Sequence, residues 1–365
     1  MTHDDEVPPG QAAQRINRRS PLHKSGKAAA LIVVGCALVA GCTEADQMSI
    51  LNPSGPAAAS ISTIWWVMFW VAAVIFVVVI GLLLFVTIRA TRRQAEHPAA
   101  PHLSTTPVPR SMSLMIAIGG IVVPAVVLAV LMVTSVSSGL SLAADADNEL
   151  VVDVVGHEWW WEVRYTDPET GEEIVTANEV HIPVGEPITF RLESADVIHS
   201  FWVPELGGKI DMIPGATNLL ELQADEPGTY RGICAEYCGI QHANMAVLVI
   251  AEEPGEFDEW LAAQAEPADG PTTEELQRGE RAFLGAQCVY CHTIDGRAES
   301  AELGPDLTHF GSRQTIGSAM IENNRGNLAG WIMDPQGIKP GNHMPATNLD
   351  EQQLQDLLDY LESLQ

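Results

Sequence analysis

Two long segments without a charged residue limit what this chain can fold into. They cover residues 64–88 and 114–136, which are 25 and 23 residues long. A helix rises about 1.5 Å per residue, so each segment can cross a hydrocarbon core of about 30 Å. We therefore predict a hairpin of two transmembrane helices over residues 61–140. Pro124 lies within the second segment and predicts a kink there.

Basic residues between the two segments predict their orientation. Arg89, Arg92, Arg93 and Arg110 lie in this connection. Basic loops stay on the cytoplasmic side of a membrane. We expect the loop 89–110 in the cytoplasm and the whole chain beyond the second helix on the outer face.

The N-terminus has the pattern of an export signal. Five basic residues precede an uncharged run, residues 28–40, that is too short to span a membrane. The run ends in "VAGC", which resembles a bacterial lipobox. We predict that residues 1–41 are a signal peptide, that Cys42 carries a lipid, and that residues 42–60 lie on the outer face. An ordinary signal peptide, followed by a cysteine by chance, is the alternative.

Residues 145–254 change to short β-rich runs separated by Gly, Pro and Asp, which predict an antiparallel sandwich or barrel. Between the last two runs lies "CAEYCGIQHANM", with Cys234, Cys238, His242 and Met245 on one loop. Thiolate, imidazole and thioether are the donors that copper prefers in electron-transfer sites. A disulfide between Cys234 and Cys238 is the alternative.

The segment "SADVIHSFWVPELGGKIDMIPG", followed by this loop, resembles subunit II of haem-copper cytochrome c oxidases. The resemblance extends from about residue 60 to residue 262 and implies a cupredoxin-like domain with a dinuclear copper A centre. The implied ligands are His199, Cys234, Cys238, His242, Met245 and the backbone carbonyl of Glu236. The Glu236 carboxylate would help to bind magnesium against subunit I, and a solvated loop acid is the alternative.

The stretch "GHEWWWEVRYTD" matches the aromatic segment of the same family, in which Trp159 would receive electrons for the copper centre. Simple packing is the alternative for three consecutive tryptophans. The chain departs from the family in two places. Glu158 stands where the family usually has glutamine, and "MIAIGGIVVP" lacks the glutamate and Trp-Thr pair that commonly begin the second helix. We therefore expect no carboxylate from this chain at a proton channel.

A second redox motif, "CVYCH", lies near the C-terminus. The spacing of Cys288 and Cys291 suits the two vinyl groups of a covalently bound haem c, and His292 would bind the iron. A thioredoxin-type cysteine pair would need a βαβ pattern that the flanking sequence lacks. Met344, in "IKPGNHMPATNL", resembles the methionine loop of small single-haem cytochromes c and is the predicted distal ligand. His343 is the alternative.

The sequence around this motif predicts a small all-α cytochrome c domain over residues 273–365. "GPDL" at 304–307 resembles the loop on the proximal side of the haem in that family. Leucines with helical spacing predict the core face of a closing helix: Leu354, Leu357, Leu358, Leu361 and Leu364. Residues 255–272 contain a short amphipathic piece and a linker rich in Ala, Pro, Gly and Thr. Such a linker would let the haem domain visit both a donor and the copper site.

The chain of 365 residues has a formal net charge of −28, and its acidic character is concentrated beyond residue 110, where 41 acidic residues face 10 basic ones. This balance excludes nucleic-acid binding through a basic surface. The negative charge suits the recruitment of a basic donor by electrostatic steering, and solubility of an exported domain is the alternative.

These features predict the electron-input subunit of a respiratory terminal oxidase in a bacterial inner membrane. The resemblance implies electrons from a quinol:cytochrome c oxidoreductase or a soluble cytochrome c. It also implies contacts with oxidase subunits I and III and with membrane lipid. Oxygen would be reduced and protons pumped in subunit I. The alternatives are a copper-delivery protein, a quinol oxidase subunit and a free-standing membrane-anchored electron carrier.

Overall fold

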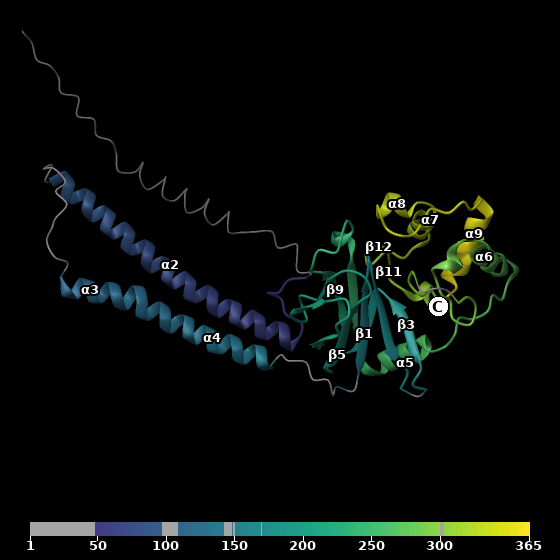
Figure 1. Ribbon diagram of the computed structural model, residues 1–365, viewed down its shortest axis with the longest axis horizontal. Coiled ribbons are helices and arrows are strands. Elements are labelled where there is room, and N and C mark those ends of the chain that lie inside the picture. The colour runs from purple at the N-terminus through teal and green to yellow at the C-terminus, as the bar shows by residue number, and fades with distance from the viewer. Residues whose placement is uncertain (1–47, 97–108, 142–147, 149, 169, 300–302) are drawn as a thin grey trace, which may run out of the picture. The chain divides into compact units, whose positions relative to one another are not determined.

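The computed structural model describes residues 48–96, 109–141, 148, 150–168, 170–299 and 303–365 (Figure 1). The predicted signal peptide and Cys42 lie outside the described residues, as does most of the loop expected at 89–110. The described chain contains two apolar helical stretches, a β-sandwich and a small helical domain.

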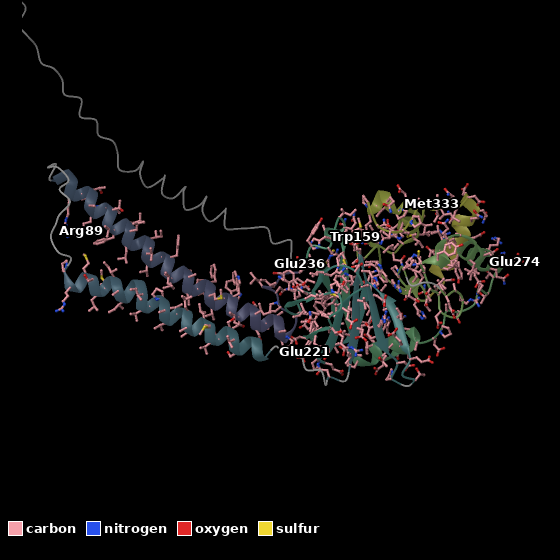
Figure 2. The ribbon with its side chains drawn as sticks, in the orientation of Figure 1. Arg89, Trp159, Glu221, Glu236, Glu274 and Met333 are labelled. Carbon is pink, nitrogen blue, oxygen red and sulfur yellow. The ribbon has the colours of Figure 1, made fainter. Side chains whose placement is uncertain are left out.

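The two apolar stretches are helical throughout. Helix α2 covers Pro56–Glu96, and the second stretch consists of α3 (Arg110–Ala117), the π-helical turn η1 (Ile118–Val122) and α4 (Val123–Ser141). Their most apolar parts reach mean hydropathies of 3.2 and 2.8, and no part of those windows is buried by the rest of the chain. Figure 2 shows their side chains projecting outward. Two helices of this length, whose most apolar parts nothing else in the described chain covers, suit a membrane.

The π-helical turn η1 ends at Val122, two residues before Pro124. Proline has no N–H to donate and its ring crowds the preceding turn, so the regular hydrogen-bond ladder cannot continue through it. The irregularity therefore falls where the sequence predicts a kink.

The β-domain is a sandwich of two sheets, each with five strands in the described part of the chain. One sheet has the order β3 (Glu173–Ala177), β2 (Trp160–Thr166), β1 (Val151–His157), β5 (Ile188–Ser194) and β8 (Asn218–Leu222). The other has the order β4 (Glu179–Pro183), β10 (Ala246–Glu252), β9 (Gly228–Cys234), β6 (His199–Trp202) and β7 (Lys209–Met212). Only the β1–β5 and β4–β10 pairs are parallel. The predicted antiparallel sandwich is therefore mixed at these two pairs.

Alternating apolar residues fill the space between the sheets. In β1, Val152 and Val154 are fully buried while their neighbours are partly exposed. This period of two is what a strand with one buried face requires. Helix α5 (Pro254–Gln264) begins the segment expected as a linker, and its Phe257 and Leu261 join the same core.

The C-terminal domain is mainly helical. It contains α6 (Glu274–Gly285), α7 (Arg325–Met333), α8 (Pro335–Ile338) and α9 (Glu351–Glu362). Short turns η3 (Cys288–Tyr290) and η4 (Phe310–Ser312) and the hairpin β11 (Thr315–Ile316) and β12 (Ile321–Glu322) connect them. The leucines predicted for the closing helix are in its core, with Leu354 at the margin. Asp350 begins α9 with a capping box completed by Gln353.

Helices α6 and α9 cross at a glycine. A Cβ on Gly279 would lie 2.1 Å from the carbonyl oxygen of Asp356 and 2.5 Å from the Cβ of Tyr360. Arg278, the preceding residue, forms a two-pronged pair with the Asp356 carboxylate, with N–O distances of 2.8 and 2.9 Å. The absence of a side chain at position 279 thus sets how closely the two helices approach.

We expect Gly279→Ala to destabilise the helical domain by about 1–3 kcal/mol, because the added methyl group must push two helix backbones apart. Gly330→Ala in α7 is the matched control, since a Cβ there makes only an ordinary 3.6 Å contact with Ile338. Thermal unfolding followed through the visible absorption of this domain measures both variants. Equal melting temperatures for the two would show that the glycine crossing does not limit the packing.

Candidate metal and haem centres

The three consecutive tryptophans form the end of a hairpin and not one continuous strand. Strand β1 ends at His157 and β2 starts at Trp160, so Trp159 occupies the turn between them. Trp161 is fully buried and packs edge-on against Phe201, with ring centroids 5.6 Å apart. Trp160 instead stacks on the ring of His157. Trp161 is therefore a core residue, and Trp159 is the one brought to the tip of the sandwich.

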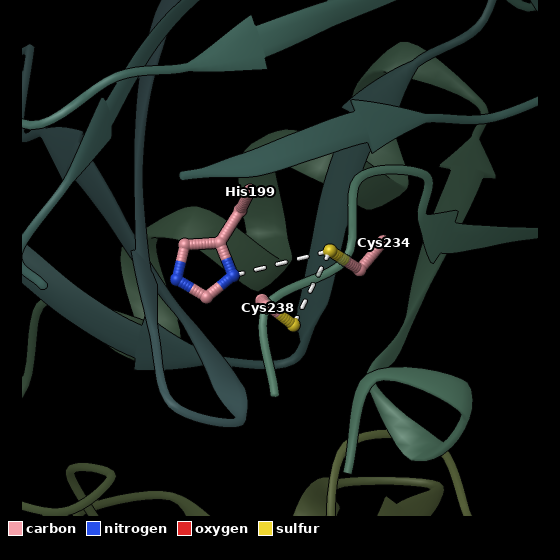
Figure 3. Close-up of side chains that lie close together, drawn as sticks. All are labelled: His199, Cys234 and Cys238. Carbon is pink, nitrogen blue, oxygen red and sulfur yellow. Dashed lines mark hydrogen bonds between the residues drawn. The ribbon is translucent and has the colours of Figure 1, made fainter. Parts of the chain in front are cut away.

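The loop between β9 and β10 gathers sulfur and nitrogen donors. The Sγ atoms of Cys234 and Cys238 lie 3.7 Å apart (Figure 3). Cys238 Sγ lies 3.7 Å from Nδ1 of His242 and 3.8 Å from Sδ of Met245. The loop is closed at its base by a hydrogen bond of 2.9 Å from the Cys234 amide to the Met245 carbonyl. All four donors thus face one small volume.

The fifth predicted donor comes from another strand of the same sheet. His199 begins β6 and is fully buried, with Nδ1 3.9 Å from Cys234 Sγ. The backbone carbonyl of Glu236 lies 3.2 Å from the same sulfur. The structure therefore brings together all six atoms that the family resemblance implies. The Glu236 side chain is exposed and points to no partner among the described residues.

An aspartate fixes the orientation of His199. The carboxylate of Asp196 lies 2.8 Å from Nε2, which directs Nδ1 towards the sulfurs. Burial disfavours the charged ring, but the hydrogen bonds to Asp196 and Cys234 outweigh it and raise the pKa of His199 to about 9. The motif "SADVIH" contains this aspartate, and sequence reasoning missed its role. Its position three residues before the histidine was the available signal.

Cys234 and Cys238 are free cysteines in this arrangement. Their separation of 3.7 Å is far longer than the roughly 2.05 Å of a disulfide bond. The hydrogen bond between the two sulfurs lowers the pKa of Cys234, and the hydrogen bond with His199 adds to this effect. The same hydrogen bond raises the pKa of Cys238. A soft cation bound to both sulfurs would relieve their buried charge.

Trp159 is attached to this loop. Its indole Nε1 donates a hydrogen bond of 2.9 Å to the carbonyl oxygen of Cys238, and the residue is 7 % exposed. Gly239 lies under the ring with φ of +119°, and a Cβ there would come within 2.9 Å of the indole. Only glycine combines this backbone conformation with the close approach. The sequence shows a glycine at position 239, but it does not show that the indole of Trp159 packs against it.

A cavity of about 990 Å³ lies between the helical domain and the tip of the β-sandwich, and the predicted haem residues Cys288, Cys291, His292 and Met344 line it. Nδ1 of His292 lies 2.7 Å from the carbonyl oxygen of Pro305, which fixes the ring and leaves Nε2 available to a ligand. Burial lowers the pKa of His292 and so favours the neutral form that a metal needs. A Cβ on Gly304 would lie 2.8 Å from this ring. The cavity therefore fits a haem, with His292 able to offer Nε2 to its iron.

The predicted alternative ligand, His343, also lines the cavity but has a further contact. Its ring lies 5.5 Å from that of Trp159, measured between centroids, at an angle of 54°. Its Nε2 lies 3.8 Å from a carboxylate oxygen of Glu158. Lys339, which sequence analysis did not single out, donates hydrogen bonds of 2.8 and 2.9 Å to the carbonyl oxygens of Trp159 and Gly317.

Comparisons with known proteins agree with both centres. Residues 169–252 match the family "Cytochrome C oxidase subunit II, periplasmic domain", and residues 276–365 match "Cytochrome c". The chain is 36% identical over 334 residues to cytochrome c oxidase subunit 2 of Alkalihalophilus pseudofirmus, across 89% of this chain and 93% of that protein. It is 34% identical over 262 residues to cytochrome c oxidase subunit 2 of Bacillus sp. (strain PS3), across 67% and 72% of the two chains.

A solved structure, the periplasmic domain of subunit II of the cytochrome oxidase of Bradyrhizobium japonicum, is 32% identical with a TM-score of 0.30. The match covers 32% of this chain and 94% of that one. The predicted fold class, a pair of apolar helices with a cupredoxin-like domain and a cytochrome c domain, is confirmed. The family matches imply copper A for the first domain and haem for the second. The chain belongs to the cytochrome c oxidase subunit 2 family, as a member with a C-terminal cytochrome c domain.

Proposed function

We propose that this chain is the electron-input subunit of a haem-copper oxidase, in which electrons pass from its c-type haem to a dinuclear copper A centre. From there they go to the haems of subunit I, where oxygen is reduced to water and protons are pumped. The observation that carries the proposal is the convergence of two thiols, two imidazoles and a thioether, with neighbouring donor atoms 3.7–3.9 Å apart. Donors of this softness select copper.

The residues that would hold the copper pair are His199, Cys234, Cys238, His242, Met245 and the carbonyl of Glu236. When bound, a copper pair held by these residues would supply one-electron redox chemistry. The protein supplies the fixed frame: Asp196 orients His199, and the Cys234 amide bonded to Met245 closes the loop. Ligands held in this way need little rearrangement when the charge of the site changes.

The second centre would be a covalent haem c, with Cys288 and Cys291 as its points of attachment and His292 and Met344 as the residues that would bind its iron. The Pro305 carbonyl fixes the tautomer of His292, which supports iron binding through Nε2. A methionine opposite the histidine suits electron transfer, because this pair of ligands raises the reduction potential of the haem. The electron donor is a quinol:cytochrome c oxidoreductase or a soluble cytochrome c.

The chain is anchored by its two apolar helices in a bacterial inner membrane, with both redox domains on the outer face and Cys42 lipidated. The loop between β9 and β10, here called the copper loop, has exposed apolar residues nearby, including Ile198 and Tyr237, which suit a surface covered by subunit I. The exposed carboxylate of Glu236 would complete a magnesium site there. Subunit III and membrane lipid are further partners.

The purified full-length chain is expected to contain two coppers and one haem, with an electron paramagnetic resonance signal from one electron shared equally by two copper nuclei. Cys234→Ser should remove that signal and leave the low-spin haem signal intact, because the two sites share no ligand. Thr217→Ser, a change on the exposed side of the sandwich, is the control. A single-copper signal in the unaltered chain, or Cys234 and Cys238 found as a disulfide, would overturn the proposal.

Asp196→Asn is expected to weaken copper binding by about 10–100-fold, since the amide no longer favours the ring orientation that directs Nδ1 of His199 to the site. Asp153→Asn, which changes only an ion pair with Arg191 elsewhere on the sandwich, should bind copper like the unaltered chain. Copper retained during competition with a chelator measures the difference. If both variants retained the same amount of copper, Asp196 would not contribute to copper binding.

The acidic surface is expected to make donor oxidation depend on salt. In the complete oxidase, the rate with a basic soluble cytochrome c should fall steeply as ionic strength rises, because steering by unlike charges is screened within roughly 10 Å at 0.1 M salt. Stopped-flow oxidation of the donor measures this. A rate indifferent to salt would leave solubility as the reason for the charge.

A further inference from the structure

We propose that the haem domain is docked on the copper domain by the loop 339–344, and that His343 in this loop passes the electron to Trp159. The inference rests on the proposed function, because it needs both centres to be loaded. It differs from the behaviour expected of a flexible linker, in which the haem domain would travel between donor and copper site.

A buried carboxylate of the copper domain is satisfied by the haem domain. Glu179 in β4 is 3 % exposed. Its oxygens accept hydrogen bonds of 2.9–3.1 Å from the amides of Gln314 and Thr315 and from the Thr315 hydroxyl. A carboxylate removed from water is costly unless it is hydrogen-bonded, so this contact favours one relative position of the two domains.

A tight turn of the haem domain lies against the start of β10, at Ala246. Gly317, Ser318 and Ala319 all have positive φ, of 70°, 71° and 53°. The Ser318 hydroxyl and carbonyl bond the backbone of Ala246, at 2.6 and 3.2 Å, and Ala319 packs on Leu248 and Ile250. Serine and alanine rarely adopt this conformation, and surrounding contacts must stabilise it. The turn is therefore shaped for this surface.

The loop 339–344 supplies the contact next to the copper site. Lys339 is 3 % exposed and donates to the carbonyl oxygens of Trp159 and Gly317. Gln241, in the copper loop, donates to the carbonyl oxygen of Pro340 at 2.5 Å. The hydrogen bonds from Lys339 to Trp159 and from Gln241 to Pro340 both connect the two domains, and they are buried and partly buried, respectively. The backbone of Trp159 and the copper loop are thus tied to the loop that precedes Met344.

The same contacts form a continuous route between the centres. Met344 lines the haem cavity, and His343 is its covalent neighbour. The His343 ring lies against Trp159, whose indole is hydrogen-bonded to the carbonyl of Cys238. Electron tunnelling decays less steeply through bonded and contacting atoms than through a gap. In this step one electron leaves the ferrous haem, which becomes ferric, and reduces the mixed-valence copper pair to two cuprous ions, with no atom or proton transferred.

The test uses the full-length chain in lipid nanodiscs, with haem and copper content established first from the optical and electron paramagnetic resonance spectra. After photoreduction of the haem, the rate of copper reduction is measured at several viscosities. The docked arrangement predicts a rate that does not change with viscosity. A rate that falls as viscosity rises would reveal a travelling domain and overturn the docking.

Substitutions of His343 test the electron route through its ring separately from the docking of the two domains. His343→Ala should slow electron transfer roughly tenfold at unchanged reduction potentials, because a gap replaces the ring, whereas His343→Phe should retain most of the rate. Gln277→Ala, on an exposed part of α6, is the control. An unchanged rate in His343→Ala would overturn the route through His343. Loss of the low-spin haem spectrum in that variant would also overturn it, because His343 would then be the axial ligand. Absence of either centre from the unaltered chain would instead refute the proposed function.

Discussion

The geometry of this protein depends on holding five soft donors together inside a β-sandwich. If two thiols, two imidazoles and a thioether were buried without a cation, their lone pairs would repel one another and have no partner. The sandwich brings the five donors together. Four of them lie on the loop that joins the paired strands β9 and β10, and the fifth, His199, lies at the start of strand β6. Cys234 ends β9, Met245 immediately precedes β10, and the two residues are hydrogen-bonded across the base of the loop.

The neighbours of the copper loop serve it in different ways. Asp196 sets the orientation of His199, and Gly239 leaves room for the indole of Trp159. The hairpin turn that carries Trp159 is held in turn by Lys339 of the haem domain. A path of direct contacts therefore connects the copper site to the second domain without passing through the linker. In this arrangement the linker limits where the haem domain can go, and the docking contacts determine where it stays.

The sequence predicted the donors because their spacing is local. Cysteines four residues apart, followed by His242 and Met245, must share a short loop, and CxxCH places its own three groups together. The apolar spans follow from length and charge alone. The docking could not be predicted, because Glu179 meets Thr315 and Trp159 meets Lys339 across more than 130 residues of chain. No periodicity indicates such a pair. The turn at Trp159 could not be predicted either, since the β-propensity of consecutive tryptophans suits a strand.

A docked haem domain holds its haem at a fixed separation from the copper pair of the same chain. Both oxidised centres carry an unpaired electron, so the haem shortens the spin relaxation of the copper centre by an amount that depends on their distance. Pulsed electron paramagnetic resonance of the frozen full-length chain measures this effect. The docked arrangement predicts a single, narrow distance that is the same with and without an electron donor bound. A broad distribution, or copper relaxation unaffected by the haem, would contradict it.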